Sequence, residues 1–316
     1  MKGIIIVMLL MIMWPPVLRA GSETTGEVLE IGVGRNTALG GAGLASIRTP
    51  AALHYNPAGL ARMRPGYYQF SYQRQIEDVG MGNVDIGGSW GETYLGGGMK
   101  YLNYGSADRL VYDEDAGLEG ELVREGSFTS SDVVLSGGAA RSYGSLTYGG
   151  VLRGLRMQID DEQAQGFAMD LGVQYRWGEG SFPIYAGGVV KNIGTGVKFV
   201  EESEELPLLV RGGVTGYMWP RAQYMSFGMH MDVEQRMEEG ELDYMVGMEW
   251  EILNRFTVMG GYDGRNEAGD KLTLGLGMIL LEEWNLPGHY MGFDYSLADR
   301  GELGSVHQFT ISVYPR

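Results

Sequence analysis

Residues 167–177, FAMDLGVQYRW, contain the pattern that decides the fold. Every odd-numbered position from Phe167 to Trp177 is apolar or aromatic, and the even-numbered positions hold Ala168, Asp170, Gly172, Gln174 and Arg176. An alternation of period two places the two sets on opposite faces of a β-strand. The stretch therefore predicts a strand with one wholly apolar face.

The same alternation recurs from Tyr67 to Tyr314 and predicts roughly fourteen strands. Their expected ranges are 67–76, 81–90, 93–104, 127–141, 143–157, 165–177, 182–193, 207–218, 222–233, 241–252, 255–263, 271–281, 288–297 and 305–314. Some connections are short, whereas acidic stretches at 107–126 and 201–205 predict long loops. This combination is typical of outer-membrane barrels. The sequence thus predicts an all-β chain whose residues 67–316 form a roughly 14-stranded antiparallel transmembrane β-barrel.

Alternation alone does not say which strand face is buried, because a soluble secreted β-sandwich alternates too. That soluble protein is the alternative to the barrel. Three features favour a barrel with its apolar face toward lipid. Many strands are long enough to cross a bilayer at a tilt, aromatic residues such as Trp177 and Trp250 lie near strand ends, and the opposite face is polar and rich in glycine. The residues expected to face the lumen include Asp170, Arg176, Arg211, His230, Asp232, Glu249 and Asp294.

Residues 1–20, MKGIIIVMLLMIMWPPVLRA, have the organisation of a signal peptide. Lys2 precedes an apolar run that ends before Pro15, and Ala20 supplies a small residue for cleavage. An uncleaved anchor is the alternative, but the run is shorter than the about 20 residues that a spanning helix needs. We expect cleavage near Ala20 and export to the outer membrane.

Residues 21–66 are rich in Gly and Ala and lack sustained alternation. Within them, Asn56-Pro57 predicts the start of a short helix, because Asn caps free backbone N–H groups and Pro is tolerated at the first helical position. A compact segment of small residues ahead of a barrel could fill its lumen as a plug. An ordered periplasmic extension is the other interpretation.

Residues 32–63, GVGRNTALGGAGLASIRTPAALHYNPAGLARM, resemble the opening of the PorV/PorQ family of outer-membrane proteins, which is related to the long-chain fatty acid transporters. The matching residues are Gly32, Gly34, Arg35, Ala38, Leu39, Gly40, Gly41 and Ala42, followed by Asn56, Pro57, Ala58, Gly59 and Leu60. The family often has an Asp between these two blocks, where this chain has Arg48-Thr49-Pro50. Any role of an acidic group there is not expected in this protein.

The resemblance implies a barrel with an N-terminal hatch that holds the Asn-Pro-Ala motif. It also implies that small hydrophobic compounds pass by rearrangement of the hatch and through a side opening. Gly96, Gly97 and Gly98 are candidates for a kink in the wall, since consecutive glycines weaken a strand. Other relatives serve the type IX secretion system, which gives the alternative function: a barrel that binds secretion-machine proteins or secreted substrates. The expected surroundings are outer-membrane lipid.

Enzymatic chemistry is not predicted. The four histidines form no H-x-x-x-H pattern, no Gly-x-Ser-x-Gly occurs, and the chain has no Cys. His230 and Asp232 share a strand face, but ordinary polar lumen residues explain them. We expect no metal and no cofactor. With a net charge of −16 and no basic stripe, the chain is also a poor candidate for binding nucleic acid.

Overall fold

The computed structural model describes residues 27–75, 79–113, 121–178, 182–199, 202–219, 224–238, 240–266, 270–280, 287–301 and 304–316. The expected signal peptide, residues 1–20, lies outside the described residues, as do residues 21–26. Within the described ranges, no helix is long and apolar enough to cross a membrane.

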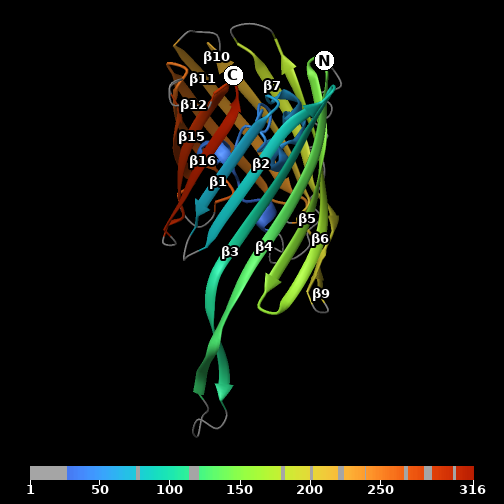
Figure 1. The fold of residues 1–316 in the computed structure, drawn as a ribbon, viewed down its shortest axis with the longest axis vertical. Helices are drawn as coiled ribbons and strands as arrows, with labels where there is room; N and C mark the ends of the chain where they lie inside the picture. The colour runs from blue at the N-terminus through green and yellow to red at the C-terminus, as the bar shows by residue number, and fades with distance from the viewer. Residues whose placement is uncertain are drawn as a thin grey trace.

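Fourteen strands close into one antiparallel barrel (Figure 1). They are β1 (Tyr67–Arg74), β2 (Gly80–Trp90), β3 (Thr93–Asp113), β4 (Glu121–Tyr143), β5 (Leu146–Ile159), β6 (Glu162–Trp177), β7 (Ile184–Thr195), β10 (Leu209–Met218), β11 (Met225–Arg236), β12 (Leu242–Ile252), β13 (Phe256–Asp263), β14 (Leu272–Ile279), β15 (His289–Asp299) and β16 (Ser305–Pro315). Each strand pairs with its neighbours in sequence, and β16 pairs with β1 to close the barrel. The predicted all-β barrel is confirmed.

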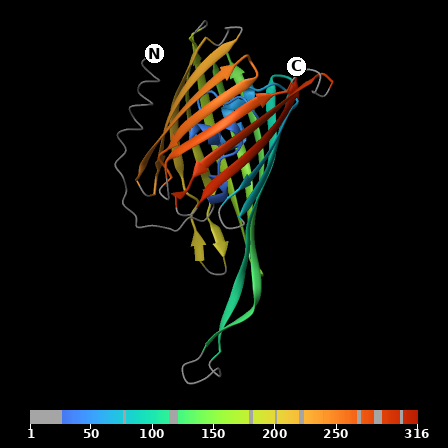
Figure 2. The ribbon, with the colours of Figure 1, turned by 90° about the vertical axis from the view of Figure 1, so that its left-hand side faces the viewer.

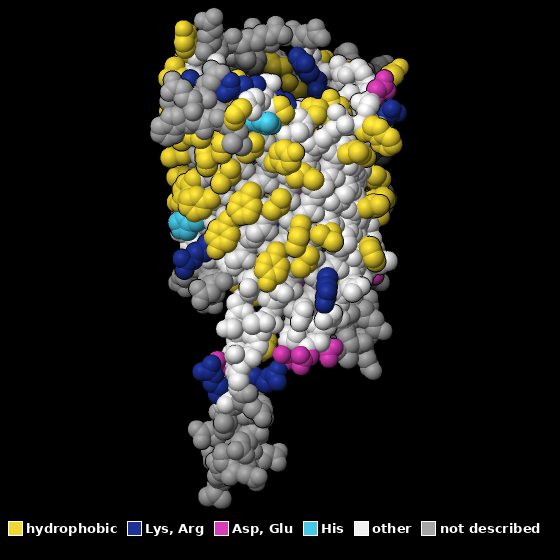
Figure 3. Space-filling model, in the orientation of Figure 1, with side chains coloured by type: hydrophobic (Ala, Val, Ile, Leu, Met, Phe, Trp, Pro, Cys, Tyr) yellow, Lys and Arg dark blue, Asp and Glu magenta, His cyan; other side chains and the backbone are white. Residues whose placement is uncertain are grey.

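The two faces of the barrel are inverted relative to a soluble protein. Exposed and buried residues alternate along β6. The Leu171 side chain points outward and is 49% exposed, whereas the neighbouring Asp170 is 1% exposed. Figure 3 shows hydrophobic side chains spread over the outer wall. Because exposing so much apolar surface to water is energetically unfavourable, this face is suited to contact with lipid. The soluble β-sandwich is therefore not the fold of this chain.

Strands β3 and β4 extend well past their neighbours. Pairing of β3 with β2 stops at Asn103, and pairing of β4 with β5 stops at Ser130. Beyond these points the two strands pair only with each other and project as a ribbon from one end of the barrel (Figure 2). We name this the ribbon end and the opposite end, where β16 finishes, the C-terminal end.

The ribbon corrects the expectation of a loop for residues 107–113 and 121–126; the middle of the expected loop, 114–120, lies outside the described residues. Leu110 pairs with Arg124, and Asp113 pairs with Glu121, so the acidic stretch continues the hairpin. A second expected loop, 201–205, contains β9 (Glu202–Glu204), which pairs with β8 (Val197–Phe199) in a separate two-stranded sheet. The acidic composition of these stretches predicted loops. Strand pairing is made by backbone groups, however, and is compatible with charged side chains.

The N-terminal segment, residues 27–66, lies inside the barrel (Figures 1 and 2). Its elements are η1 (Glu27–Leu29), η2 (Gly34–Leu39), α2 (Ala52–Tyr55) and η3 (Pro57–Arg62). Leu53 and Leu60 are fully buried in one cluster with inward side chains of the wall such as Val134, Val151 and Leu155. Burying each leucine contributes about 2 kcal/mol. The larger hydrophobic cluster of the described residues thus lies between this segment and one side of the wall, β2 to β6, and a smaller one joins Ala38 and Leu39 to Met259 of β13.

Candidate functional site: the N-terminal segment against the barrel wall

Asn56 joins three parts of the molecule. Its side-chain oxygen accepts a hydrogen bond from the Ala58 N–H at 3.2 Å and caps η3, whose first residue is Pro57. Its amide nitrogen donates to the main-chain oxygens of Leu44, at 3.3 Å, and of Val173 on β6, at 3.1 Å. The side chain is fully buried. Because an unpaired buried amide is costly, these bonds fix the start of η3 against the wall.

Glycines in the wall allow this close approach. A Cβ atom on Gly149 would lie 2.7 Å from the Pro57 carbonyl oxygen, and one on Gly187 would lie 2.9 Å from the Ala45 Cα. A Cβ on Gly172 would overlap the Asn56 side chain. Any larger residue at these positions of β5, β6 and β7 would push the segment away from the wall.

Gly96, Gly97 and Gly98 have a comparable position on β3. A Cβ on Gly96 would lie 2.9 Å from Leu60 Cδ2, so this glycine also makes room for the segment. Across all three glycines β3 keeps unbroken register with both β2 and β4. The pairing is therefore continuous at the position expected to be kinked.

The strand pairing of the wall is interrupted between β6 and β7 instead. Their register shifts between Met169 and Leu171, and Asn192 adopts a left-handed conformation with φ of 61°. Asp170 compensates, because its Oδ1 accepts a hydrogen bond from the Asn192 N–H at 2.9 Å. Asn192 was not predicted as a site residue. An Asn within a strand pattern is the available signal, since Asn is enriched at positive φ.

One buried charge cluster holds the loop of residues 40–44 in the N-terminal segment. Asp232 Oδ2 accepts hydrogen bonds from the N–H groups of Gly43, at 2.9 Å, and Leu44, at 3.1 Å, and from Arg211 Nη2 at 2.7 Å. Arg211 also donates to the Gly41 carbonyl and lies 3.5 Å from Glu234. A buried charge needs such partners, so the pair stabilises only one position of the loop.

A second cluster binds Arg35 of the segment. Arg35 Nη2 lies 3.1 Å from Glu249 Oε2, and Glu249 is also 3.5 Å from His230 Nε2. Burial lowers the pKa of Arg35, but the carboxylates of Glu249 and Asp294 outweigh that effect and raise the pKa above its ordinary value. Arg35 is therefore cationic at any physiological pH.

Arginine and lysine side chains of the wall also bind the backbone of the segment. Arg153 donates to the Leu53 oxygen at 2.7 Å and to Asp170 at 2.5 Å. Lys100 donates to the oxygens of Val28, at 3.0 Å, and Ile31, at 2.7 Å. The segment has little regular structure, so its carbonyl groups need these partners. Lys100 and Arg153 were not predicted, although isolated charges on a glycine-rich strand face are a signal for such a role.

His54 gives the segment a titratable contact with β2. Its Nε2 lies 2.9 Å from Asp85 Oδ1, and Asn83 donates to Asp85 Oδ2 at 2.6 Å. Burial lowers the pKa of His54, and the cations of Lys100 and Arg153 act in the same direction against Asp85. His54 is therefore neutral near pH 7.

The clusters account for most of the lumen residues expected from the sequence. Asp170, Arg211, His230, Asp232, Glu249 and Asp294 all belong to them or lie beside them, whereas Arg176 is half-buried near the C-terminal end and joins none. His230 and Asp232 do not form a pair, since His230 Nδ1 is 3.0 Å from Thr215 and Asp232 binds Arg211. Among the described residues, no group of three or more His, Cys, Asp or Glu side chains could hold a metal ion.

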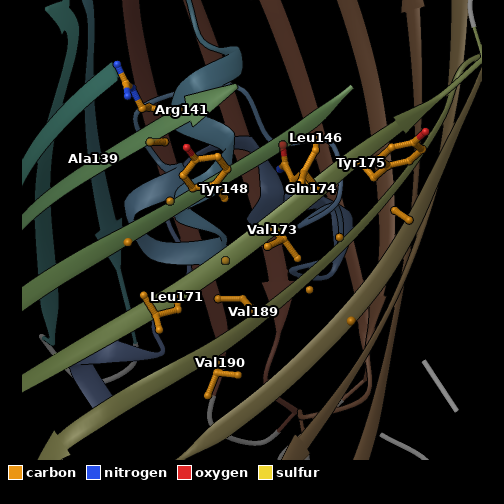
Figure 4. Close-up of a pocket in the computed structure, with 18 of the residues that line it drawn as sticks. Ala139, Arg141, Leu146, Tyr148, Leu171, Val173, Gln174, Tyr175, Val189 and Val190 are labelled. Atoms are coloured by element: carbon orange, nitrogen blue, oxygen red, sulfur yellow. The ribbon is translucent and has the colours of Figure 1, made fainter. Parts of the chain in front are cut away.

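A groove of about 810 Å³ lies on the outer wall over β4 to β7 and β10 (Figure 4). Leu146, Tyr148, Leu171 and Val173 line it, together with Gly150, Ala186 and Gly188. In Figure 4 the N-terminal segment lies directly behind these strands. Because Gly149, Gly172 and Gly187 contact the segment from inside, little more than strand backbone separates Asn56 from this apolar groove.

A second cavity, of about 640 Å³, lies between the segment and the ribbon end of the barrel. Glu30, Thr37 and Tyr55 of the segment line it, together with polar side chains near the strand ends such as Gln73 and Arg300. The segment therefore separates a polar cavity at one end from the part of the lumen that faces the apolar groove.

No protein-family model matches the chain, and no curated protein matches it in sequence. Solved structures do match its fold. The toluene transporter TodX of Pseudomonas putida superimposes with a TM-score of 0.56 at 12% identity, over 90% of this chain and 97% of that one. The toluene transporter TbuX of Ralstonia pickettii gives a TM-score of 0.50 at 15% identity, again over 90% and 97%. At these identities the similarity establishes a shared barrel fold.

Proposed function

We propose that this protein lies in the outer membrane and allows small hydrophobic compounds to cross it, with residues 21–66 acting as a hatch. The observation that carries the proposal is a lumen filled by a separate segment whose Asn56 contacts the wall directly behind an apolar groove. The similarity in fold to two toluene transporters supports the same class of cargo. We infer that the protein is of the PorV/PorQ type, because residues 32–63 resemble the opening of that family. No catalytic step is needed.

The hatch is held by bonds that could exchange without unfolding the barrel. Its contacts with the wall are apolar packing and hydrogen bonds between wall side chains and its backbone, in which Arg153 donates and Asp232 accepts, and not strand pairing. The barrel itself is closed by continuous backbone pairing. A rearrangement of the segment would therefore leave the wall intact and open a route through the lumen. The groove outside Asn56 is the apolar surface nearest to that route.

Uptake of labelled toluene and of labelled benzyl alcohol into vesicles with a lipopolysaccharide outer leaflet tests the proposal, because a plain phospholipid bilayer passes such compounds without a protein. The chain has no Cys, so introduced cysteines form the only disulfide. The pair Ala38→Cys/Gly275→Cys would join the hatch to β14. A Cβ on Gly275 falls closer to the Ala38 Cβ than the about 3.8 Å of a disulfide, so the bond forms once the hatch moves slightly away from β14. We expect uptake by the unmodified protein, loss of uptake in the oxidised variant and recovery on reduction.

The matched control joins two wall strands and leaves the hatch free. Met99 and Leu135 face each other across β3 and β4 on the outer wall. Oxidised Met99→Cys/Leu135→Cys should transport normally. Undiminished uptake with the hatch joined to the wall would refute the role of the hatch. Absence of uptake of both compounds by the unmodified protein would refute the transport function.

One observation favours a second candidate, a barrel that binds secreted proteins for a type IX secretion machine. The ribbon of β3 and β4 projects from the barrel with both of its strand edges unpaired beyond Asn103 and Ser130. Such edges can accept a strand from another protein. Copurification of secreted proteins with the full chain, and their loss when residues 106–127 are replaced by a short turn, would support this function.

A further inference from the structure

The cavity at the ribbon end has a chemistry that differs from the groove on the outer wall. Its lining combines three arginines, Arg236, Arg265 and Arg300, with three carboxylates, Glu30, Glu241 and Asp263. Apolar side chains also contribute, among them Ile31, Pro207 and Val306. A ligand that fills this space must therefore satisfy both polar and apolar surfaces.

The arginines of the cavity are already bound by protein groups. Arg265 donates to Asp263 Oδ1 at 2.8 Å and to Oδ2 at 2.9 Å. Arg236 lies 3.6 Å from Glu30, and Arg300 donates to the Asn266 side-chain oxygen at 2.7 Å. With equal numbers of arginines and carboxylates in the lining, an anionic ligand gains little net attraction and faces repulsion from the acids. The cavity is thus poorly suited to a carboxylate.

Gln73 provides a group that a neutral ligand could bind. It lies on the inner face of β1, lines the cavity and is 5% exposed. Its side-chain oxygen accepts no hydrogen bond from any described residue. The facing residue on β16, Gln308, directs its own amide nitrogen to Gly34 and Thr310. A buried acceptor without a donor is unfavourable, so a ligand that brings an O–H or N–H group would be favoured there.

We propose that this cavity is the entry site for the transported compounds and that it selects apolar molecules carrying one uncharged hydrogen-bond donor. A hydroxyl group would donate to Gln73, and the apolar body would pack on Ile31, Pro207 and Val306. Bare hydrocarbons leave Gln73 unsatisfied, and carboxylates meet Glu30 and Asp263. The role in entry rests on the proposed transport function, whereas the binding preference is independent of it.

Calorimetric titration of the full chain in lipid nanodiscs with toluene, benzyl alcohol and benzoate tests this preference. Empty nanodiscs correct for partitioning into lipid. We expect benzyl alcohol to bind about 5–10-fold more tightly than either of the other two, the effect of one satisfied buried acceptor. Tightest binding of benzoate, or equal binding of all three, would overturn the proposal.

Variants of Gln73 locate the site. Gln73→Leu should reduce the affinity for benzyl alcohol to that for toluene, whereas Gln73→Glu keeps an acceptor and should retain the preference for the alcohol. Gln69→Leu is the matched control, because Gln69 is also buried on the inner face of β1 but does not line the cavity. An unchanged preference in Gln73→Leu would refute the site. Selective binding without uptake of any compound would refute transport alone.

Discussion

The Asn56 amide nitrogen lies 3.1 Å from the main-chain oxygen of Val173, a residue 117 positions later on wall strand β6. The same side chain caps η3 and binds Leu44. One buried amide thus sets the position of the N-terminal segment relative to the barrel, on the wall whose outer side carries the apolar groove.

Asn56→Ala should loosen the segment without unfolding the barrel. The variant loses the η3 cap and leaves the Leu44 oxygen with one partner fewer, a cost of about 2–3 kcal/mol. Hydrogen exchange across residues 38–63 should accelerate, while the heat-modifiable gel mobility of the barrel stays the same. Asn36→Ala is the control, because Asn36 binds only the Ala42 oxygen within the segment. Equal acceleration in both variants would contradict the anchoring role of the bond to the wall.

Gly149→Ala should displace η3 from the wall. Its Cβ would fall 2.7 Å from the Pro57 oxygen, a backbone atom that cannot rotate away, and relief of this overlap costs about 1–3 kcal/mol. Gly137→Ala on the neighbouring strand β4 is the comparison, since no atom outside the adjacent residues lies within 4 Å of its Cβ position. The denaturation midpoint of the segment is measured by its susceptibility to limited proteolysis at increasing denaturant concentration. This midpoint should fall for Gly149→Ala and stay constant for Gly137→Ala.

Asp232→Asn should be among the most destabilising single changes in the lumen. Arg211 is buried and would lose its closest carboxylate, which costs about 3–5 kcal/mol for a buried pair broken on one side. Urea unfolding of the detergent-solubilised protein measures the loss. Glu92→Gln, which breaks the exposed pair with Arg141, should leave the midpoint unchanged. A neutral result for Asp232→Asn would mean that Glu234 alone can hold Arg211.

The N-terminal segment should loosen as the pH falls through the ordinary titration range of histidine. Because burial lowers the pKa of His54 in the folded state, the unfolded segment binds more protons, and stability rises with pH. His54 thus contributes stability above its unfolded pKa of about 6.5 that is lost as pH falls through the folded pKa. The protection factors of residues 51–63, which correct exchange rates for the intrinsic slowing of amide exchange at low pH, should fall in that window, and His54→Gln should abolish the dependence. Protection factors that rise at low pH would show that Asp85 dominates.

Local patterns in the sequence predict much of this structure. The apolar and polar faces of β6, the approximate ranges of the barrel strands and the cap at Asn56 all follow from residues close together in the chain. Period-two alternation and capping act over a few residues, so they can be read without knowing the partners. The same local reading was wrong for residues 107–113 and 121–126, where the acidic composition suggested a loop and backbone pairing made a ribbon.

The contacts that make the site depend on tertiary structure. Asp232 meets Gly43 across a separation of 189 residues, and Gln73 becomes a buried acceptor only because loop ends from β11, β13 and β15 surround the same cavity. The sequence by itself determined a barrel with an apolar outer face and a capped N-terminal segment. Closure of the barrel decided which wall residues touch that segment, because strand register and strand tilt, set by pairing over the whole sheet, fix the distances between groups far apart in the chain.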